Sequence, residues 1–141
     1  MPTKINLKNI PTGYQTIINN GRHSILADEP VLSKGTDLGF SPADLILSGL
    51  GMCKVATVRF IARKKQWTIG NVDAELVMNV ERGAGGALSM QVTVALHIEG
   101  DISEEQRQEL IREADACYIH RMIKGEWSIA GAVELASAGS R

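Results

Sequence analysis

The feature that most constrains this fold is a long apolar segment that follows Ser41. Ser41 is a preferred N-cap residue, Pro42 suits the first helical position, and Asp44 completes the pattern of a capping box. Apolar residues then occupy nearly every face of the helix until its basic end, Arg63-Lys64-Lys65. A helix that is apolar all round has to be buried. The sequence therefore predicts a core helix that runs from Pro42 to about Lys65.

The segments around this helix alternate between apolar and polar residues, which is typical of strands. Short strands are expected at 4–9, 13–19 and 23–27, where Pro-Thr-Gly and Asn-Gly steps provide the turns. Two longer strands are expected at 71–81 and 88–98, joined by a glycine-rich connection. The long pair should form an antiparallel hairpin whose apolar face is covered by helices.

A second helix is expected to begin at Ser103, where Gln106 completes another capping box. Its apolar positions are spaced by three and four residues and include Leu110 and Cys117, so both side chains should face the interior. After Gly125 a last strand over 127–135 is expected to close the sheet. This order predicts a single α+β domain over residues 1–141 with antiparallel sheets.

Charge and hydropathy exclude several classes of protein. The 15 basic and 16 acidic side chains are nearly balanced, which removes the electrostatic case for nucleic acid binding. The N-terminus has no continuous apolar stretch, and no later segment has about twenty uninterrupted apolar residues, so we expect no membrane association and a cytoplasmic location.

The only two cysteines, Cys53 and Cys117, lie in the two predicted helices. In a reducing compartment a lasting structural disulfide is not expected, so the thiols could be inert core residues, metal ligands or redox groups. Neither a Cys-x-x-Cys spacing nor a run of histidines supports zinc. The glycines at 83, 85 and 86 do not lead from a strand into a helix, as a phosphate loop would. We expect neither a metal nor a cofactor.

Three motifs in order identify a family resemblance. They are Asp28-Glu29-Pro30 followed by Gly35-Thr36-Asp37-Leu38-Gly39-Phe40-Ser41-Pro42, then Gly51-Met52-Cys53, then Ala114-Asp115-Ala116-Cys117-Tyr118-Ile119-His120-Arg121 with Lys124-Gly125-Glu126. Together they resemble the OsmC/Ohr family over about residues 20–135. The resemblance implies an intertwined homodimer in which antiparallel sheets wrap two long central helices and the active sites lie at the subunit interface.

The resemblance also implies roles for named residues. Cys53 would attack an organic hydroperoxide and become a sulfenic acid, Cys117 would resolve it as a disulfide, and a thiol or dithiol reductant would restore both thiols. Cys53 lies too deep in its helix to gain much from the helix dipole, so a basic side chain is needed to activate it. Arg22 is the candidate, with Glu29 as its partner.

The sequence departs from the family pattern at two places. Ala43 stands where the peroxidase branches carry glutamate, ten residues before Cys53, and Asp44 is one step round the helix. Tyr118 replaces the proline that often follows the second cysteine, which permits a continuous helix. In that case His120 would share a helix face with Cys117 and could relay a proton; otherwise His120 belongs to a connecting turn.

Two other functions remain open. A non-catalytic homodimer could use the interface pocket to bind a small apolar ligand, or could sense oxidants through its thiols, and Ala43 favours this alternative. A structural or partner-binding module with inert thiols is the third. The hydroperoxidase hypothesis is preferred because both cysteines lie in matching motifs.

Overall fold

The predicted core helix is present as α1 (Pro42–Lys64) in the computed structural model, which describes residues 2–136. The Ser41 hydroxyl accepts a hydrogen bond from the Asp44 N–H at 3.2 Å, and the Asp44 carboxylate accepts one from the Ser41 N–H at 2.9 Å. By length and composition alone α1 could cross a membrane. The structure packs one face of α1 against β4 (Val72–Arg82) and α2 (Glu104–Glu113). Ile46, Met52 and Phe60 on α1 are each at least 60% exposed, so the expected burial on all sides is not met within the protomer.

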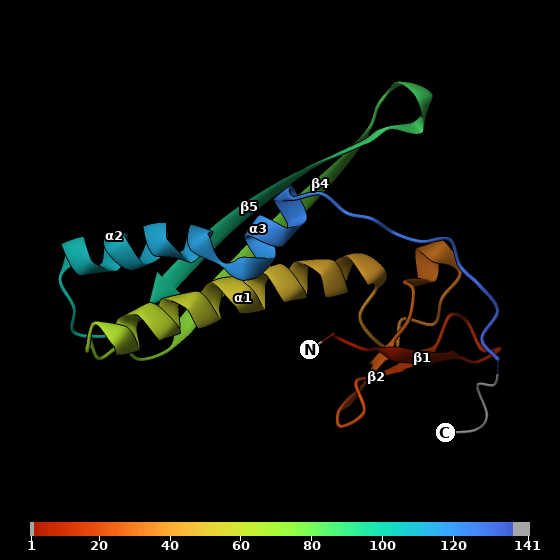
Figure 1. Ribbon diagram of the computed structural model, residues 1–141, viewed down its shortest axis with the longest axis horizontal. Helices are drawn as coiled ribbons and strands as arrows, with labels where there is room; N and C mark the ends of the chain where they lie inside the picture. Colours follow the sequence, from red (N-terminus) through yellow and green to blue (C-terminus); the bar gives the residue numbers. More distant parts are fainter. Residues whose placement is uncertain (1, 137–141) are drawn as a thin grey trace.

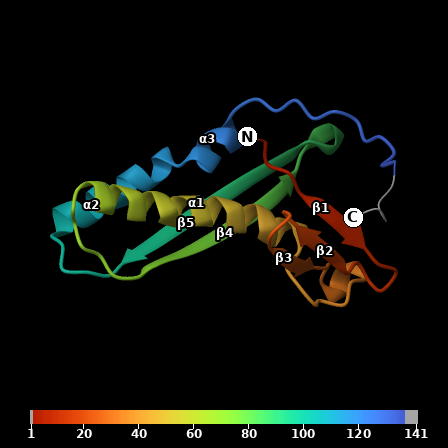
Figure 2. The ribbon, with the colours of Figure 1, turned by 60° about the horizontal axis from the view of Figure 1, so that its bottom comes forward.

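The three short N-terminal strands form an antiparallel sheet at one end of α1 (Figures 1 and 2). They are β1 (Asn6–Asn9), β2 (Thr16–Asn19) and β3 (Ser24–Ala27), in the order β1-β2-β3. A short 3-10 helix, η1 (Val31–Ser33), lies in the loop that leads to α1. These strands agree with the sequence prediction, although they begin one to three residues later.

The long hairpin pairs β4 with β5 (Leu88–Ile98) in an antiparallel register. The register places apolar residues opposite one another, for example Val72 opposite Ile98 and Leu76 opposite Val94. The glycine-rich connection forms η2 (Ala84–Gly86), in which Gly85 and Gly86 have positive φ angles of 68° and 80°. Glycine adopts this backbone conformation without steric cost, which explains its use at the hairpin tip.

The second predicted helix is interrupted. After α2 the chain forms η3 (Ala114–Ala116), then Cys117 adopts an extended conformation with φ −65° and ψ 147°, and α3 (Tyr118–Lys124) begins. The prediction of a continuous helix through Cys117 and Tyr118 is therefore wrong. His120 lies in a new short helix, and not on a continuation of α2 or in a connecting turn. The physical reason is that Cys117 serves as the N-cap of α3, a position that requires non-helical backbone.

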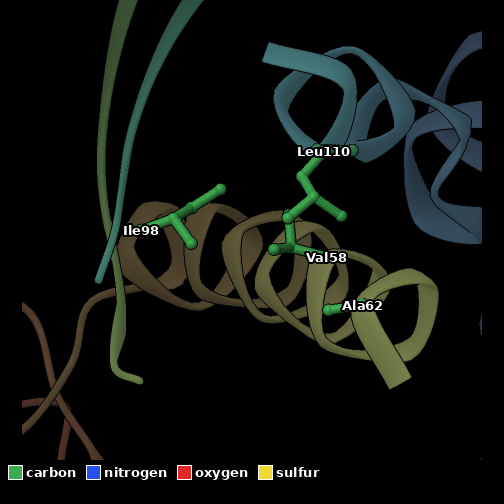
Figure 3. Packing of buried hydrophobic residues seen from close by; sticks show 5 residues of the cluster. Val58, Ala62, Ile98 and Leu110 are labelled. Atoms are coloured by element: carbon green, nitrogen blue, oxygen red, sulfur yellow. The ribbon is translucent and has the colours of Figure 1, made fainter. Parts of the chain in front are cut away.

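The core lies where α1, α2 and the base of the hairpin meet (Figure 3). Val58 and Ala62 come from α1, Leu110 from α2 and Ile98 from the end of β5, and all four are at most 1% exposed. The spacing of 58 and 62 places both side chains on one face of α1. Half-buried apolar residues such as Trp67 and Leu96 complete the cluster.

The helices cover only part of the hairpin. On its outer half Val80, Leu88 and Met90 are each at least 50% exposed, and the hairpin extends beyond the helices (Figure 1). The expectation that helices cover the apolar face of the hairpin is thus confirmed near Ile98. Toward the hairpin tip no helix of the described chain covers that face.

The predicted strand at 127–135 is absent from the described residues. From Gly125 to residue 136 the chain contains no strand, and it runs toward the side of the molecule where β1–β3 lie (Figures 1 and 2). A strand requires a neighbour that pairs with its backbone groups. This segment pairs with no strand in the protomer, so its alternating apolar residues, including Trp127, Ile129 and Val133, remain exposed.

Candidate active site

Cys53 lies in the middle of α1 and is half-buried. Its Sγ accepts a hydrogen bond from the backbone N–H of Ile119 at 3.4 Å, although 66 positions separate the two residues. This contact joins α1 to the first turn of α3. It places the Cys53 sulfur beside the segment that carries Cys117.

Cys117 is buried, with 1% of its surface exposed. Its Sγ accepts a hydrogen bond from the backbone N–H of His120 at 3.3 Å and thereby caps α3. Cys117 and Leu110 are both buried, as the three-and-four spacing predicted, although η3 separates α2 from Cys117.

The two sulfurs lie near each other within one chain, because they accept hydrogen bonds from the consecutive N–H groups of Ile119 and His120, and both thiols are free. Burial raises the pKa of the Cys117 thiol, the His120 N–H lowers it, the neighbouring Cys53 raises it, and the charge of Lys54 lowers it. The net direction is upward, so Cys117 is mainly protonated at neutral pH. The tertiary structure thus brings together the two residues that the motifs singled out.

Lys54 is a site residue that no motif indicates. It is only 2% exposed, and its Nζ lies 3.2 Å from Asp115 Oδ1 and 2.8 Å from His120 Nδ1. A buried ammonium is costly unless it is paired and hydrogen-bonded, and here both partners are present. In the sequence its signal is one lysine within an otherwise apolar stretch of α1.

Arg22 and Glu29 are not brought to the thiols in the protomer. Arg22 is exposed in the turn between β2 and β3, where its backbone N–H donates to the Asn20 side chain. Across residues 2–136, no ion pair or hydrogen bond joins Arg22 to Glu29, or either of them to Cys53. Their catalytic roles remain predictions.

The carboxylate that organises the loop before α1 is Asp28, the neighbour of Glu29. It is 2% exposed and accepts hydrogen bonds from the backbone N–H groups of Tyr14, Glu29, Thr36 and Leu38 and from the Thr36 hydroxyl. Burial by itself would raise the pKa of Asp28, but these hydrogen bonds outweigh it and lower the pKa to about 2. Asp28 therefore has a structural role.

A groove of about 480 Å³ adjoins the Lys54 cluster. Lys54, Asp115, His120 and Lys124 line its polar part, and its apolar wall consists of Leu50, Met90, Val92, Val94 and Ile123. A larger hollow of about 620 Å³ lies between α1 and β4, and neither of the two hollows is lined by a thiol. The smaller groove is the better candidate for a substrate because it contains the polar groups next to the cysteines.

Metal ligation has no support in the described part of the chain. Residues 2–136 contain no group of three or more histidine, cysteine, aspartate or glutamate side chains arranged to hold a metal ion. The polar groups at this site are instead two thiols, a lysine and a histidine. Such a set suits proton transfer and thiol chemistry.

Comparison with solved structures places the fold. An OsmC-like protein from Mycoplasma pneumoniae has a TM-score of 0.73 at 22% identity, with 89% of each chain covered. The organic hydroperoxide resistance protein OsmC from Legionella pneumophila has a TM-score of 0.69 at 16% identity, covering 89% of this chain and 90% of that one. The organic hydroperoxide resistance protein OhrB of Bacillus subtilis has a TM-score of 0.65 at 17% identity, covering 89% and 92%.

A search of curated protein sequences finds no match. The family described as OsmC-like protein matches residues 35–130, a range that contains α1, the hairpin and both cysteines. This match covers more than half of the chain and agrees with the antiparallel sheets and the helices of the structure. The chain belongs to the OsmC-like protein family.

Proposed function

We propose that this protein is a cysteine-based, thiol-dependent peroxidase that reduces organic hydroperoxides. The observation that carries the proposal is that the Cys53 and Cys117 sulfurs accept hydrogen bonds from two consecutive backbone N–H groups of one chain, those of Ile119 at 3.4 Å and His120 at 3.3 Å. Two thiols that come together from separate helices can form and release a disulfide, provided that the backbone allows their Cα atoms within about 7 Å.

The exposure of the two thiols supports a division of labour. Cys53 is half-buried, whereas Cys117 is buried, so Cys53 is the thiol that a peroxide reaches first. The Cys53 thiolate attacks the terminal peroxide oxygen, the O–O bond breaks, and the products are a sulfenic acid and an alcohol. Cys117 then condenses with the sulfenic acid to form the disulfide and water, and an external thiol or dithiol reduces the disulfide.

The groove beside the site supports an organic substrate. Apolar side chains such as Leu50 and Val92 can contact a hydrocarbon group, while small polar oxidants gain nothing from such a wall. The relatives from Legionella pneumophila and Bacillus subtilis are described as organic hydroperoxide resistance proteins, which is the same chemistry.

A homodimer is part of the proposal. Large apolar residues are exposed on α1, on the outer hairpin and in the segment after Gly125, among them Met52, Met90 and Ile129. Monomeric proteins rarely leave so much contiguous apolar surface uncovered. A second copy would cover the hairpin, place α1 beside its counterpart and give the 127–135 segment a strand to pair with. Analytical ultracentrifugation should give twice the chain mass.

The test of the enzymatic proposal is peroxide consumption by wild type and two serine variants under saturating dithiol. Wild type should turn over cumene hydroperoxide and lose two titratable thiols per chain when the reductant is withheld. Cys53→Ser should not consume peroxide. When the reductant is withheld, Cys117→Ser should consume one equivalent and stop at the sulfenic acid, which a dimedone reagent detects. Equal turnover by Cys53→Ser would rule the proposal out.

Arg22 and Glu29 can be tested with the same assay. If Arg22 activates Cys53 across the proposed dimer, Arg22→Ala should lower the rate of peroxide consumption at least about tenfold, the low end of an opposite charge's effect on a thiol pKa. Lys34→Ala is the matched control, because Lys34 is an exposed cation in the next loop, which leads from β3 to α1. Glu29→Gln should lower the rate of peroxide consumption by a similar factor to Arg22→Ala if the two residues act together.

The alternative function is a non-catalytic homodimer that binds a small apolar ligand or senses oxidants. It is favoured by Ala43, and the structure adds that Asp44 is committed to the capping box with Ser41 and does not replace the missing glutamate. This alternative expects a disulfide that forms once and slow or absent turnover with reductant. Rapid turnover would exclude it.

A further inference from the structure

Lys54 is a buried cation whose side chain does not extend to solvent. Long lysine side chains on a helix usually place the ammonium in water, but Lys54 is 2% exposed. Among residues 2–136 its one carboxylate partner is Asp115, whose side chain is 76% exposed. The ammonium of Lys54 therefore lies in the buried space between α1 and the segment that carries Cys117.

His120 links this cation to the second cysteine. An ammonium has only donors, so the contact of 2.8 Å between Lys54 Nζ and His120 Nδ1 makes Nδ1 the acceptor and leaves the proton of the neutral ring on Nε2. The backbone N–H of the same residue donates to Cys117 Sγ at 3.3 Å. Lys54 thus holds the residue that hydrogen-bonds the thiol.

Cys117 needs such support because its surroundings favour the neutral thiol. Burial and the adjacent Cys53 raise its pKa, while the His120 N–H and the charge of Lys54 lower it. The charged groups around Cys117 are Lys54 from α1 and Asp115 from η3, the latter mostly solvated.

The titratable groups on α3 complete the surroundings of Cys117. His120 donates its N–H to the thiol; Arg121 is exposed and lies over the Tyr118 ring, and Lys124 is an exposed residue that lines the groove. Lys54 is the one buried cation among the groups that face the thiol in residues 2–136.

We propose that Lys54 is the positioning residue for the resolving step, because its ammonium orients His120 and stabilises the thiolate of Cys117. This inference rests on the proposed peroxidase function. In the step it assists, the Cys117 sulfur attacks the sulfur of the Cys53 sulfenic acid. The S–S bond forms as the S–O bond breaks, and the proton lost by Cys117 combines with the departing hydroxide to give water.

The test measures the thiol rather than the enzyme. In a Cys53→Ser background, the ultraviolet absorbance of the Cys117 thiolate is followed against pH with and without Lys54→Met, a neutral replacement of similar length. Removal of an opposite charge at short range should move the midpoint upward by about one pH unit, a tenfold loss of thiolate. Lys64→Met, an exposed lysine of the same helix, is the matched control and should leave the midpoint unchanged.

Each outcome decides one claim. An unchanged midpoint in folded Lys54→Met overturns the role of Lys54 and leaves the peroxidase proposal intact. A shifted midpoint together with a wild type that consumes no peroxide supports the stabilisation of the Cys117 thiolate by Lys54 but refutes the peroxidase, and with it the role of Lys54 in a resolving step. If Lys54→Met does not fold, nitrogen-15 chemical shifts of the wild-type His120 ring decide: the Nε2–H tautomer is expected, and the Nδ1–H tautomer overturns the inference.

Discussion

Oxidation of the thiol pair should stabilise the protein strongly. A bond between Cys53 and Cys117 would close a loop of 64 residues (117 minus 53). The chain-entropy relation for a loop of this length gives about 4 kcal/mol of stabilisation at 25 °C, provided that closure adds no strain. The two sulfurs accept hydrogen bonds from the consecutive N–H groups of Ile119 and His120 in the reduced structure, which supports closure with little backbone movement.

The assay is guanidinium unfolding of reduced and peroxide-treated protein at one fixed protein concentration, because a dimer makes the midpoint depend on concentration. With a slope of about 4 kcal/mol per molar for a domain of this size, the midpoint should rise by about 1 M on oxidation. Cys117→Ser treated with the same peroxide is the control, and its unfolding midpoint should not shift. Coincident midpoints for reduced and oxidised wild type, or an equal shift in the control, would refute the idea that the two thiols pair within a chain.

Three further predictions concern the scaffold of the site. Leu110→Ala should cost about 3 kcal/mol in urea unfolding, because Leu110 is fully buried in the core; Leu32→Ala, at 98% exposure, should change stability by less than about 0.5 kcal/mol. Asp28 has its pKa lowered from 3.8 to about 2, so its stabilisation is present above about pH 4 and is lost as the pH falls toward 2. The unfolding midpoint of wild type should therefore fall more steeply over that range than the midpoint of Asp28→Asn, and parallel curves would contradict the role of Asp28. Gly51→Ala should fail to give the usual helix gain of about 1 kcal/mol, because its Cβ would lie 2.9 Å from Leu76 Cδ1; a clear rise in the melting temperature would show that Leu76 moves aside freely.

Local sequence signals predicted most of the elements. The Ser41 capping box and the apolar run after it located α1 within one residue at each end, and the period-two pattern located β4 and β5 equally well. These predictions succeeded because capping and side-chain alternation depend on residues close together in the chain. The strand predicted at 127–135 failed for the opposite reason, since a strand also needs a distant partner and the protomer does not provide one.

The site divides in the same way. The motifs indicated Cys53 and Cys117, but the pattern could not show that Cys117 ends one helix and caps the next, because its spacing relative to Leu110 suits both arrangements. Lys54 had no motif at all. Arg22 and Glu29 carry only the family resemblance, and the protomer adds no contact that links them to the thiols.

The sequence by itself located the capped start of each main helix and the long hairpin and singled out the two thiols, because these follow from residue type and short-range spacing. Only the tertiary structure decided that the thiols meet within one chain, since Cys53 and Ile119 are 66 positions apart and come together through the packing of α3 on α1. It also decided that Lys54 is buried against His120 and Asp115. A lysine has the same identity on a solvated face and in a core, and its chemical role depends on the groups that the fold places around it.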